Sequence, residues 1–137
     1  MQKALTFPCS LKVLDTLRAE TETFCRTAGM DAIASGEIEL AINEACTNIV
    51  RHSGLPGAAT FSVVLSVENG VLTAVIADKG KPFDFDQART IKDTSDLKTK
   101  KPASGMGVFF IRKLVDTVEY RRLPGGSNEL TLKKKIQ

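Results

Sequence analysis

The segment Glu37–Ser53, EIELAINEACTNIVRHS, decides how the rest of the chain is interpreted. Its apolar residues recur at helical spacing and predict a helix with one buried face. These residues are Leu40, Ala41, Ala45, Ile49 and Val50. Ser35 is the expected N-cap, and Gly54 is expected to end the helix.

A second face of the same predicted helix carries polar side chains. Glu44, Asn48 and His52 follow one another at intervals of four residues and therefore lie in one stripe. A carboxylate can accept a proton, a carboxamide oxygen can bind a hard cation, and an imidazole adds a further polar contact. The stripe also fits solvated side chains on a surface helix, so other segments must decide between the two interpretations.

The remaining segments predict further strands and helices. A short alternating run, Lys3–Phe7, predicts an edge strand before Pro8. A helix capped by Ser10 then runs to Gly29. The Asn-Gly step at residues 69–70 predicts a hairpin between two β-branched runs. The predicted elements after Gly54 are strands at Thr60–Val67 and Val71–Ala77, a helix from Val108 to Val115, and a hairpin of Thr117–Leu123 and Glu129–Ile136.

This order of elements predicts the fold class. Helices segregated from a mostly antiparallel sheet indicate an α+β fold, a two-layer α/β sandwich with helices covering one face of the sheet. At 137 residues, the chain is expected to form a single domain, residues 1–137. We therefore look for function in one compact unit.

Composition narrows the class of protein. The 19 basic and 16 acidic residues are spread along the chain and give a net charge of +3, so charge gives no indication of direct nucleic-acid binding. Cys9, Cys25 and Cys46 lack a metal-binding or redox spacing and predict reduced, mostly buried thiols. Without an apolar leader or a membrane-spanning run, we expect a soluble, cytoplasmic protein that does not bind a membrane.

Two more segments could contribute to a ligand site. Asp78 ends an apolar strand, where its carboxylate could accept a hydrogen bond from an exocyclic amine. Gly80 would leave room for a flat ring beside it. The alternative interpretation is that Asp78 only starts a turn. Ser104-Gly105-Met106-Gly107 begins a helix, where glycines let backbone amides approach a phosphate, although such glycines can also be purely steric. The polar stretch before it contains lysines that could cover a polyphosphate or simply be solvated, namely Lys92, Lys98, Lys100 and Lys101.

Taken together, the three segments resemble the N, G1 and G2 boxes of the Bergerat-fold ATPases, which include gyrase and the histidine kinases. The surrounding sequences are similar to those of small serine kinases that act as bacterial anti-sigma factors. These sequences are EACTNIVRHS, VIADKGKPFDF and SGMGVFFIRKLVD. The resemblance extends from Lys3 to Ile136 and implies the Bergerat ATP-binding fold of the histidine kinase-like ATPase superfamily.

The resemblance implies a role for each matching position. Glu44 would be the general base, and Asn48 would bind the Mg²⁺ of the bound ATP. Asp78 would accept from the adenine amino group, with Gly80 beside the ring. The other expected nucleotide contacts are Arg51 or His52 and the amides of Gly105, Met106, Gly107 and Val108. Arg18 on the first helix would bind a partner protein, with Arg26 as the alternative.

The implied function is an ATP- and Mg²⁺-dependent serine-protein kinase. It would phosphorylate a STAS-type anti-anti-sigma protein and sequester a sigma factor, with a homodimer as the expected assembly. Two alternatives stay open: a non-catalytic ATP-binding partner-switch module, and the isolated catalytic domain of a histidine kinase. The chain departs from the family pattern at Ala103, where some members have arginine, and at Ser127-Asn128-Glu129, which replaces the usual Gly-Thr step of the last hairpin.

Overall fold

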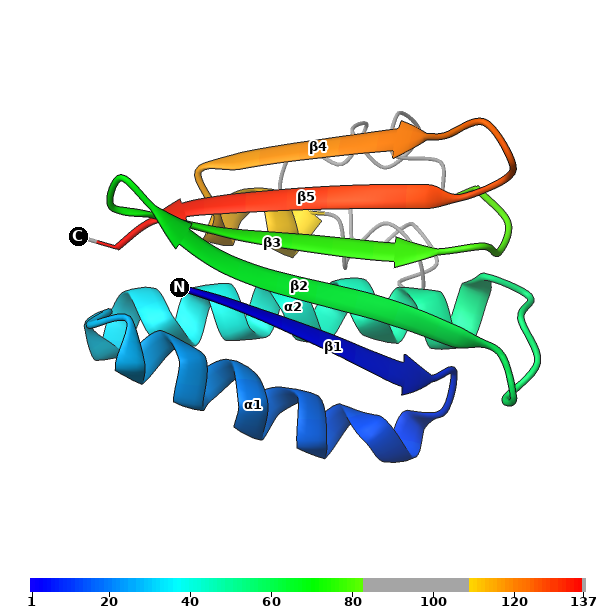
Figure 1. The fold of residues 1–137 in the computed structure, drawn as a ribbon, viewed down its shortest axis with the longest axis horizontal. Helices are drawn as coiled ribbons and strands as arrows, with labels where there is room; N and C mark the ends of the chain where they lie inside the picture. The colour runs from blue at the N-terminus through cyan, green and yellow to red at the C-terminus, as the bar shows by residue number, and fades with distance from the viewer. Residues whose placement is uncertain (83–108, 137) are drawn as a thin grey trace, which may run out of the picture.

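A five-stranded antiparallel sheet forms one layer of the molecule in the computed structural model, which describes residues 1–82 and 109–136. The strands are β1 (Gln2–Pro8), β2 (Thr60–Glu68), β3 (Val71–Asp78), β4 (Thr117–Arg122) and β5 (Asn128–Lys135). Their order is β1-β2-β3-β5-β4, and each neighbouring pair is antiparallel. β3 is therefore central, and its C-terminal end lies beside the start of β5 (Figure 1).

Helices form the second layer, on one side of the sheet (Figure 1). They are α1 (Leu14–Thr27), which follows the short 3-10 turn η1 (Leu11–Val13), α2 (Ala32–His52), and a helical segment at residues 109–114. Alternate residues of the inner strands are buried toward this layer, namely Phe61, Val63, Leu65, Leu72, Ala74, Ile76, Leu130 and Leu132. The period-two burial confirms the predicted α+β sandwich with helices on one face.

Local signals set the start of η1, the end of α1 and the first hairpin. The predicted cap Ser10 belongs to η1, because the N-cap of α1 is Val13, which makes no side-chain capping bond. The Ser10 hydroxyl accepts a hydrogen bond from the Lys12 amide at 3.2 Å, and the chain leaves α1 through Gly29 with a φ of +82°. At the hairpin, Asn69 and Gly70 have φ of 54° and 75° between the paired residues Glu68 and Val71. Positive φ at both positions is what a two-residue hairpin turn requires, so the predicted hairpin is confirmed.

The start of α2 was predicted wrongly. The helix begins at Ala32, and its cap is Asp31, whose Oδ1 accepts from the Ala34 amide at 2.8 Å. Ser35 instead lies inside the helix and donates to Glu39 Oε2 at 2.7 Å. Gly36 is thus an interior residue of the helix, despite an unfavourable helix propensity of about 1 kcal/mol.

The buried face of α2 also differs from the predicted one. Leu40, which was expected to be buried, is 46% exposed. The residues of α2 that are buried are Ile38, Ala41, Ile42, Ala45 and Cys46. The inward face is therefore rotated from the predicted one, since residues 38, 42 and 46 lie on the line that meets the sheet and α1.

The three cysteines are free, buried thiols, as expected. Desolvation raises the pKa of Cys25 to about 11, and complete burial raises the pKa of Cys46 as well. Desolvation is also the main reason that the pKa of Cys9 is raised, with Asp78 as a second cause. Since the thiolate is the reactive form, these residues are poor nucleophiles at neutral pH.

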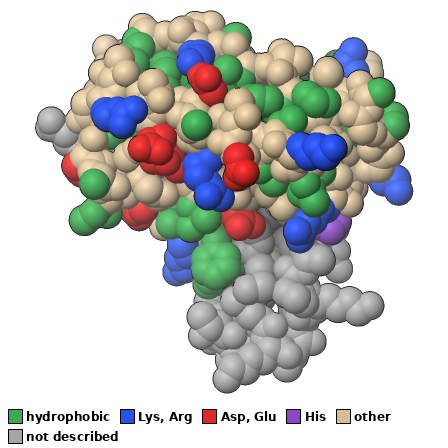
Figure 2. Space-filling model, turned by 90° about the horizontal axis from the view of Figure 1, so that it is seen from below, with side chains coloured by type: hydrophobic (Ala, Val, Ile, Leu, Met, Phe, Trp, Pro, Cys, Tyr) green, Lys and Arg blue, Asp and Glu red, His purple; other side chains and the backbone are tan. Residues whose placement is uncertain are grey.

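The surface on the α1 side of the molecule is of mixed charge. Figure 2 shows acidic and basic side chains side by side on the face that lies below in Figure 1.

Within residues 1–82 and 109–136, no helix combines the length and apolar character that crossing a bilayer requires.

Candidate functional site

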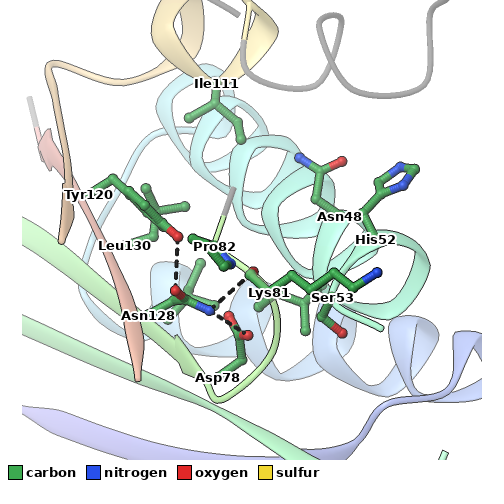
Figure 3. A pocket seen from close by; sticks show the side chains of 12 residues that line it. Asn48, His52, Ser53, Asp78, Lys81, Pro82, Ile111, Tyr120, Asn128 and Leu130 are labelled. Carbon is green, nitrogen blue, oxygen red and sulfur yellow. Dashed lines mark hydrogen bonds between the residues drawn. The ribbon is translucent and has the colours of Figure 1, made fainter. Parts of the chain in front are cut away.

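A pocket lies where the end of α2, the end of β3, the helical segment at 109–114 and the last hairpin meet (Figure 3). Its walls are Asn48, Ile49, His52, Ser53, Ile76, Asp78, Lys81, Pro82, Ile111, Tyr120, Asn128 and Leu130. The structure thus brings Asn48, His52 and Asp78, which were predicted from two distant segments, into one cavity.

The wall combines aliphatic side chains with a few polar groups. Ile49, Ile76, Ile111 and Leu130 supply the apolar surface, and Asp78 adds a carboxylate beside them. Such a surface suits a flat, mostly apolar ring with polar edges, which is the usual design of a small-molecule pocket. An adenine ring is a ligand of this kind.

Asp78 is held in place by hydrogen bonds to one of its two oxygens. Oδ1 accepts from the Gly80 amide at 2.8 Å and from the Asn128 side-chain Nδ2 at 3.0 Å. Neither donor is a cation, so the Asp78 carboxylate is held here by hydrogen bonds from neutral groups. The carboxylate is therefore oriented by Gly80 and by Asn128, and Asn128 lines the pocket beside it (Figure 3).

The loop after β3 packs directly against the C-terminal end of α2. The Lys81 amide donates to the Ser53 carbonyl at 2.8 Å. A Cβ on Gly80 would lie 2.4 Å from Ser53 Cβ and 2.7 Å from the Ser53 carbonyl oxygen. Gly80 is thus required for close approach of two backbones, and this contact fixes the Asp78 loop against the helix that carries Asn48.

Gly80→Ala is expected to destabilise the protein by about 1–3 kcal/mol, because the added methyl group forces these two backbones apart. Gly36→Ala is the matched control: no heavy atom lies within 4 Å of its Cβ position, and α2 gains a better helix former. That control is expected to stabilise by about 0.5–1 kcal/mol. Urea denaturation of both variants measures the two changes, and equal signs would contradict the packing explanation.

Asn128 is a site residue that the sequence did not identify as such. It is 2% exposed, begins β5 and lines the pocket, and its Nδ2 bonds to Asp78. The available signal was the departure at Ser127-Asn128-Glu129, where a carboxamide stands in the position of the usual Gly-Thr step. Its partners in the last hairpin, Tyr120 and Arg122, were also missed.

The other predicted residues stand outside the described pocket wall. Glu44 is half-buried on α2, one helical turn before Asn48, at a typical Cβ separation of about 6 Å. Arg51 is exposed near the end of the same helix, and Gly80 lies behind the wall against Ser53. Gly105, Met106, Gly107 and Val108 lie outside the described residues. Arg18 is exposed on α1, and no residue of α1 lines the described pocket wall. Arg26 is also exposed and forms an ion pair with Glu22 at 3.8 Å.

The donor set also limits how a cation could be held. Among residues 1–82 and 109–136, no cluster of three His, Cys, Asp or Glu side chains could hold a metal ion. Mg²⁺ in nucleotide sites is commonly held by one or two protein groups together with substrate phosphates. The Asn48 carboxamide oxygen fits this second arrangement.

The chain matches a known protein family over most of its length. A family profile described as "Histidine kinase-like ATPase domain" matches residues 7–134. The chain belongs to this family. The ATPase-domain fold predicted from the three sequence boxes is thereby confirmed.

Curated relatives of this ATPase domain include proteins named Serine-protein kinase RsbW from Bacillus cereus and Bacillus anthracis. Each is 30% identical over 86 residues, which cover 61% of this chain. The matched region spans 54% of the length of these relatives, so about half of each relative is represented.

Two solved structures share the fold of the ATPase domain. The RsbU and RsbW domains of a Mycobacterium tuberculosis protein match with a TM-score of 0.73 at 17% identity, covering 98% of this chain and 32% of that one. The SiaB–SiaC complex from Pseudomonas aeruginosa matches with a TM-score of 0.60 at 14% identity, covering 96% of this chain and 88% of that one. At these identities, the likeness is one of fold.

Proposed function

We propose that this ATPase domain is a serine-protein kinase of the anti-sigma-factor type, which transfers phosphate from ATP to an anti-anti-sigma protein. The observation that carries the proposal is the shared pocket of Asn48 and Asp78, with Glu44 one turn away on the same helix. The relatives named Serine-protein kinase RsbW support the choice of reaction.

The pocket has groups suited to binding the nucleotide. The aliphatic wall of Ile49, Ile76, Ile111 and Leu130 would contact the faces of the adenine ring. Asp78 would accept a hydrogen bond from the adenine amino group. The phosphates would extend toward Asn48, within reach of Arg51 or His52. The backbone amides of Gly105, Met106, Gly107 and Val108 would complete the phosphate site.

Phosphoryl transfer depends mainly on positioning and charge neutralisation. Bound Mg²⁺ would supply that neutralisation, with the Asn48 oxygen as the protein ligand. Glu44 would accept the proton of the substrate's serine hydroxyl. The serine oxygen would bond to the γ-phosphorus while the bond between that phosphorus and ADP breaks. Glu44 lies one helical turn before Asn48, so its carboxylate would act near the phosphates rather than near the adenine ring.

The partners follow from the same proposal. The P. aeruginosa structure is a complex of SiaB with SiaC, which supports a protein partner for a chain of this fold. We assign the substrate to the STAS-type anti-anti-sigma class and the sequestered partner to the sigma factors, with a homodimer as the assembly. Arg18, exposed on α1, would contact the partner away from the described pocket wall.

Incubation with γ-labelled ATP, Mg²⁺ and a STAS protein encoded beside this chain tests the proposal. Labelled phosphoserine on the STAS protein is the expected product. ATP binding without labelled serine would instead identify a non-catalytic partner-switch module. Label on a histidine of a separately supplied dimerisation domain would identify a histidine kinase catalytic domain.

A further inference from the structure

The buried carboxamide of Asn128 is fully engaged at its nitrogen end. Nδ2 lies 3.0 Å from Asp78 Oδ1, 3.0 Å from the Gly80 carbonyl oxygen and 3.3 Å from the Lys81 carbonyl oxygen. All three neighbours are acceptors. Only the nitrogen of the amide can face them, because an oxygen would meet three other oxygens without a proton between them.

The oxygen end of the Asn128 side chain is fixed in the same way. Oδ1 accepts from the Tyr120 hydroxyl at 2.9 Å and from Arg122 Nη1 at 2.8 Å. A guanidinium has no acceptor, so this contact requires the amide oxygen. The last hairpin therefore sets the orientation of the amide, and Arg122 Nη1 also donates to the Gly80 carbonyl at 2.9 Å.

This orientation determines which oxygen of Asp78 can recognise a ligand. Oδ1 already accepts from the Gly80 amide and from Asn128, and a carboxylate oxygen has about two lone-pair sites. Within the described part of the chain, the donors that contact the Asp78 carboxylate both bond to Oδ1. Oδ2 is left as the single acceptor that the carboxylate can offer to the pocket.

A single acceptor distinguishes between purines. Adenine presents one amino donor beside a ring nitrogen that accepts, and it needs one carboxylate oxygen. Guanine presents two adjacent donors, its N1–H and its 2-amino group, and binds a carboxylate best through both oxygens. We propose that Asn128 is a positioning residue. Its hydrogen bond occupies Asp78 Oδ1, and the pocket therefore binds adenine in preference to guanine. This inference rests on the proposed nucleotide binding.

Calorimetric titration of the full chain with a non-hydrolysable ATP analogue and with the matching GTP analogue tests this role. In Asn128→Ser, the short hydroxyl cannot span the contacts to Asp78, so we expect ATP-analogue affinity to fall about tenfold. GTP-analogue affinity is expected to hold or rise, because Oδ1 becomes available. The ratio of the two affinities is the decisive readout, since a general loss of structure would lower both together.

Two further variants complete the experiment. Tyr120→Phe removes one donor to the Asn128 oxygen with little change of shape, and we expect a smaller shift of the ratio in the same direction. Glu129→Gln is the matched control, because it alters the next residue of β5 at its exposed pairing with Arg121, and the ratio should not change.

The outcomes separate the inference from the proposed function. An unchanged ratio in folded Asn128→Ser, or in Tyr120→Phe if the serine variant does not fold, overturns the role of Asn128. Failure of the wild-type chain to bind either analogue overturns the proposed nucleotide binding itself.

Discussion

Glu44→Gln is expected to lower the rate of phosphate transfer by about 10²–10⁴-fold, the usual contribution of a general base. The amide keeps the size of the carboxylate but cannot accept the serine proton at neutral pH. ATP affinity should change by less than about twofold, because Glu44 stands outside the described pocket wall. Single-turnover transfer to the STAS protein and calorimetric ATP binding measure the two effects separately.

Glu37→Gln is the matched control for this substitution. Glu37 lies on the same helix, two turns before Glu44, and its carboxylate is 3.7 Å from the Lys134 ammonium group. The same chemical change there removes a partly exposed ion pair, which typically contributes less than about 1 kcal/mol to stability. Transfer should continue at the wild-type rate. Equal transfer rates in the two variants would remove Glu44 from the chemistry.

Asp78→Asn is expected to weaken ATP binding by about 10- to 100-fold, the effect of losing a hydrogen bond to a charged group. The surrounding donors determine how the new amide is oriented. The Gly80 amide and Asn128 Nδ2 both point at the Oδ1 position, so the oxygen of the new side chain must stay there. Its NH₂ group then faces the pocket and meets the adenine amino group, donor against donor.

Inosine triphosphate provides the internal comparison for Asp78→Asn. Its base has a carbonyl oxygen where adenine has the amino group, so the new NH₂ group could donate to it. We expect the preference for ATP over inosine triphosphate to narrow or invert. Asp15→Asn, an exposed substitution on α1, should leave both affinities unchanged. ATP affinity equal to wild type in Asp78→Asn would exclude Asp78 from base recognition.

Much of the fold was predictable because the deciding signals are local. The Asn69-Gly70 step, the Ser10 cap and the alternating apolar residues of β2 and β3 each act over a few residues. The errors arose where competing local signals were similar. Ser35 and Asp31 are both good caps, and the helix uses Asp31, whose Oδ1 accepts from the Ala34 amide. Leu40 has the right chemistry for the core but lies on the exposed side of that helix.

The candidate site was predictable only in part. Asn48, His52 and Asp78 were found from spacing and from the resemblance, and the structure places all three on one pocket wall. Asn128 and its partner Arg122 were not found, because their role consists of contacts to residues more than forty positions earlier in the chain. No local pattern contains such a contact.

The sequence by itself determined the order of elements, the antiparallel hairpins and the stripe that carries Glu44 and Asn48, since periodicity and turn chemistry depend on near neighbours. Tertiary structure alone decided that the end of β3 lies against the end of α2 and beside the start of β5. That meeting joins Asp78 to Asn128 and leaves one carboxylate oxygen for a ligand. The physical reason is that hydrogen-bond saturation of a buried group is decided by whichever distant segments packing brings within about 3 Å of it.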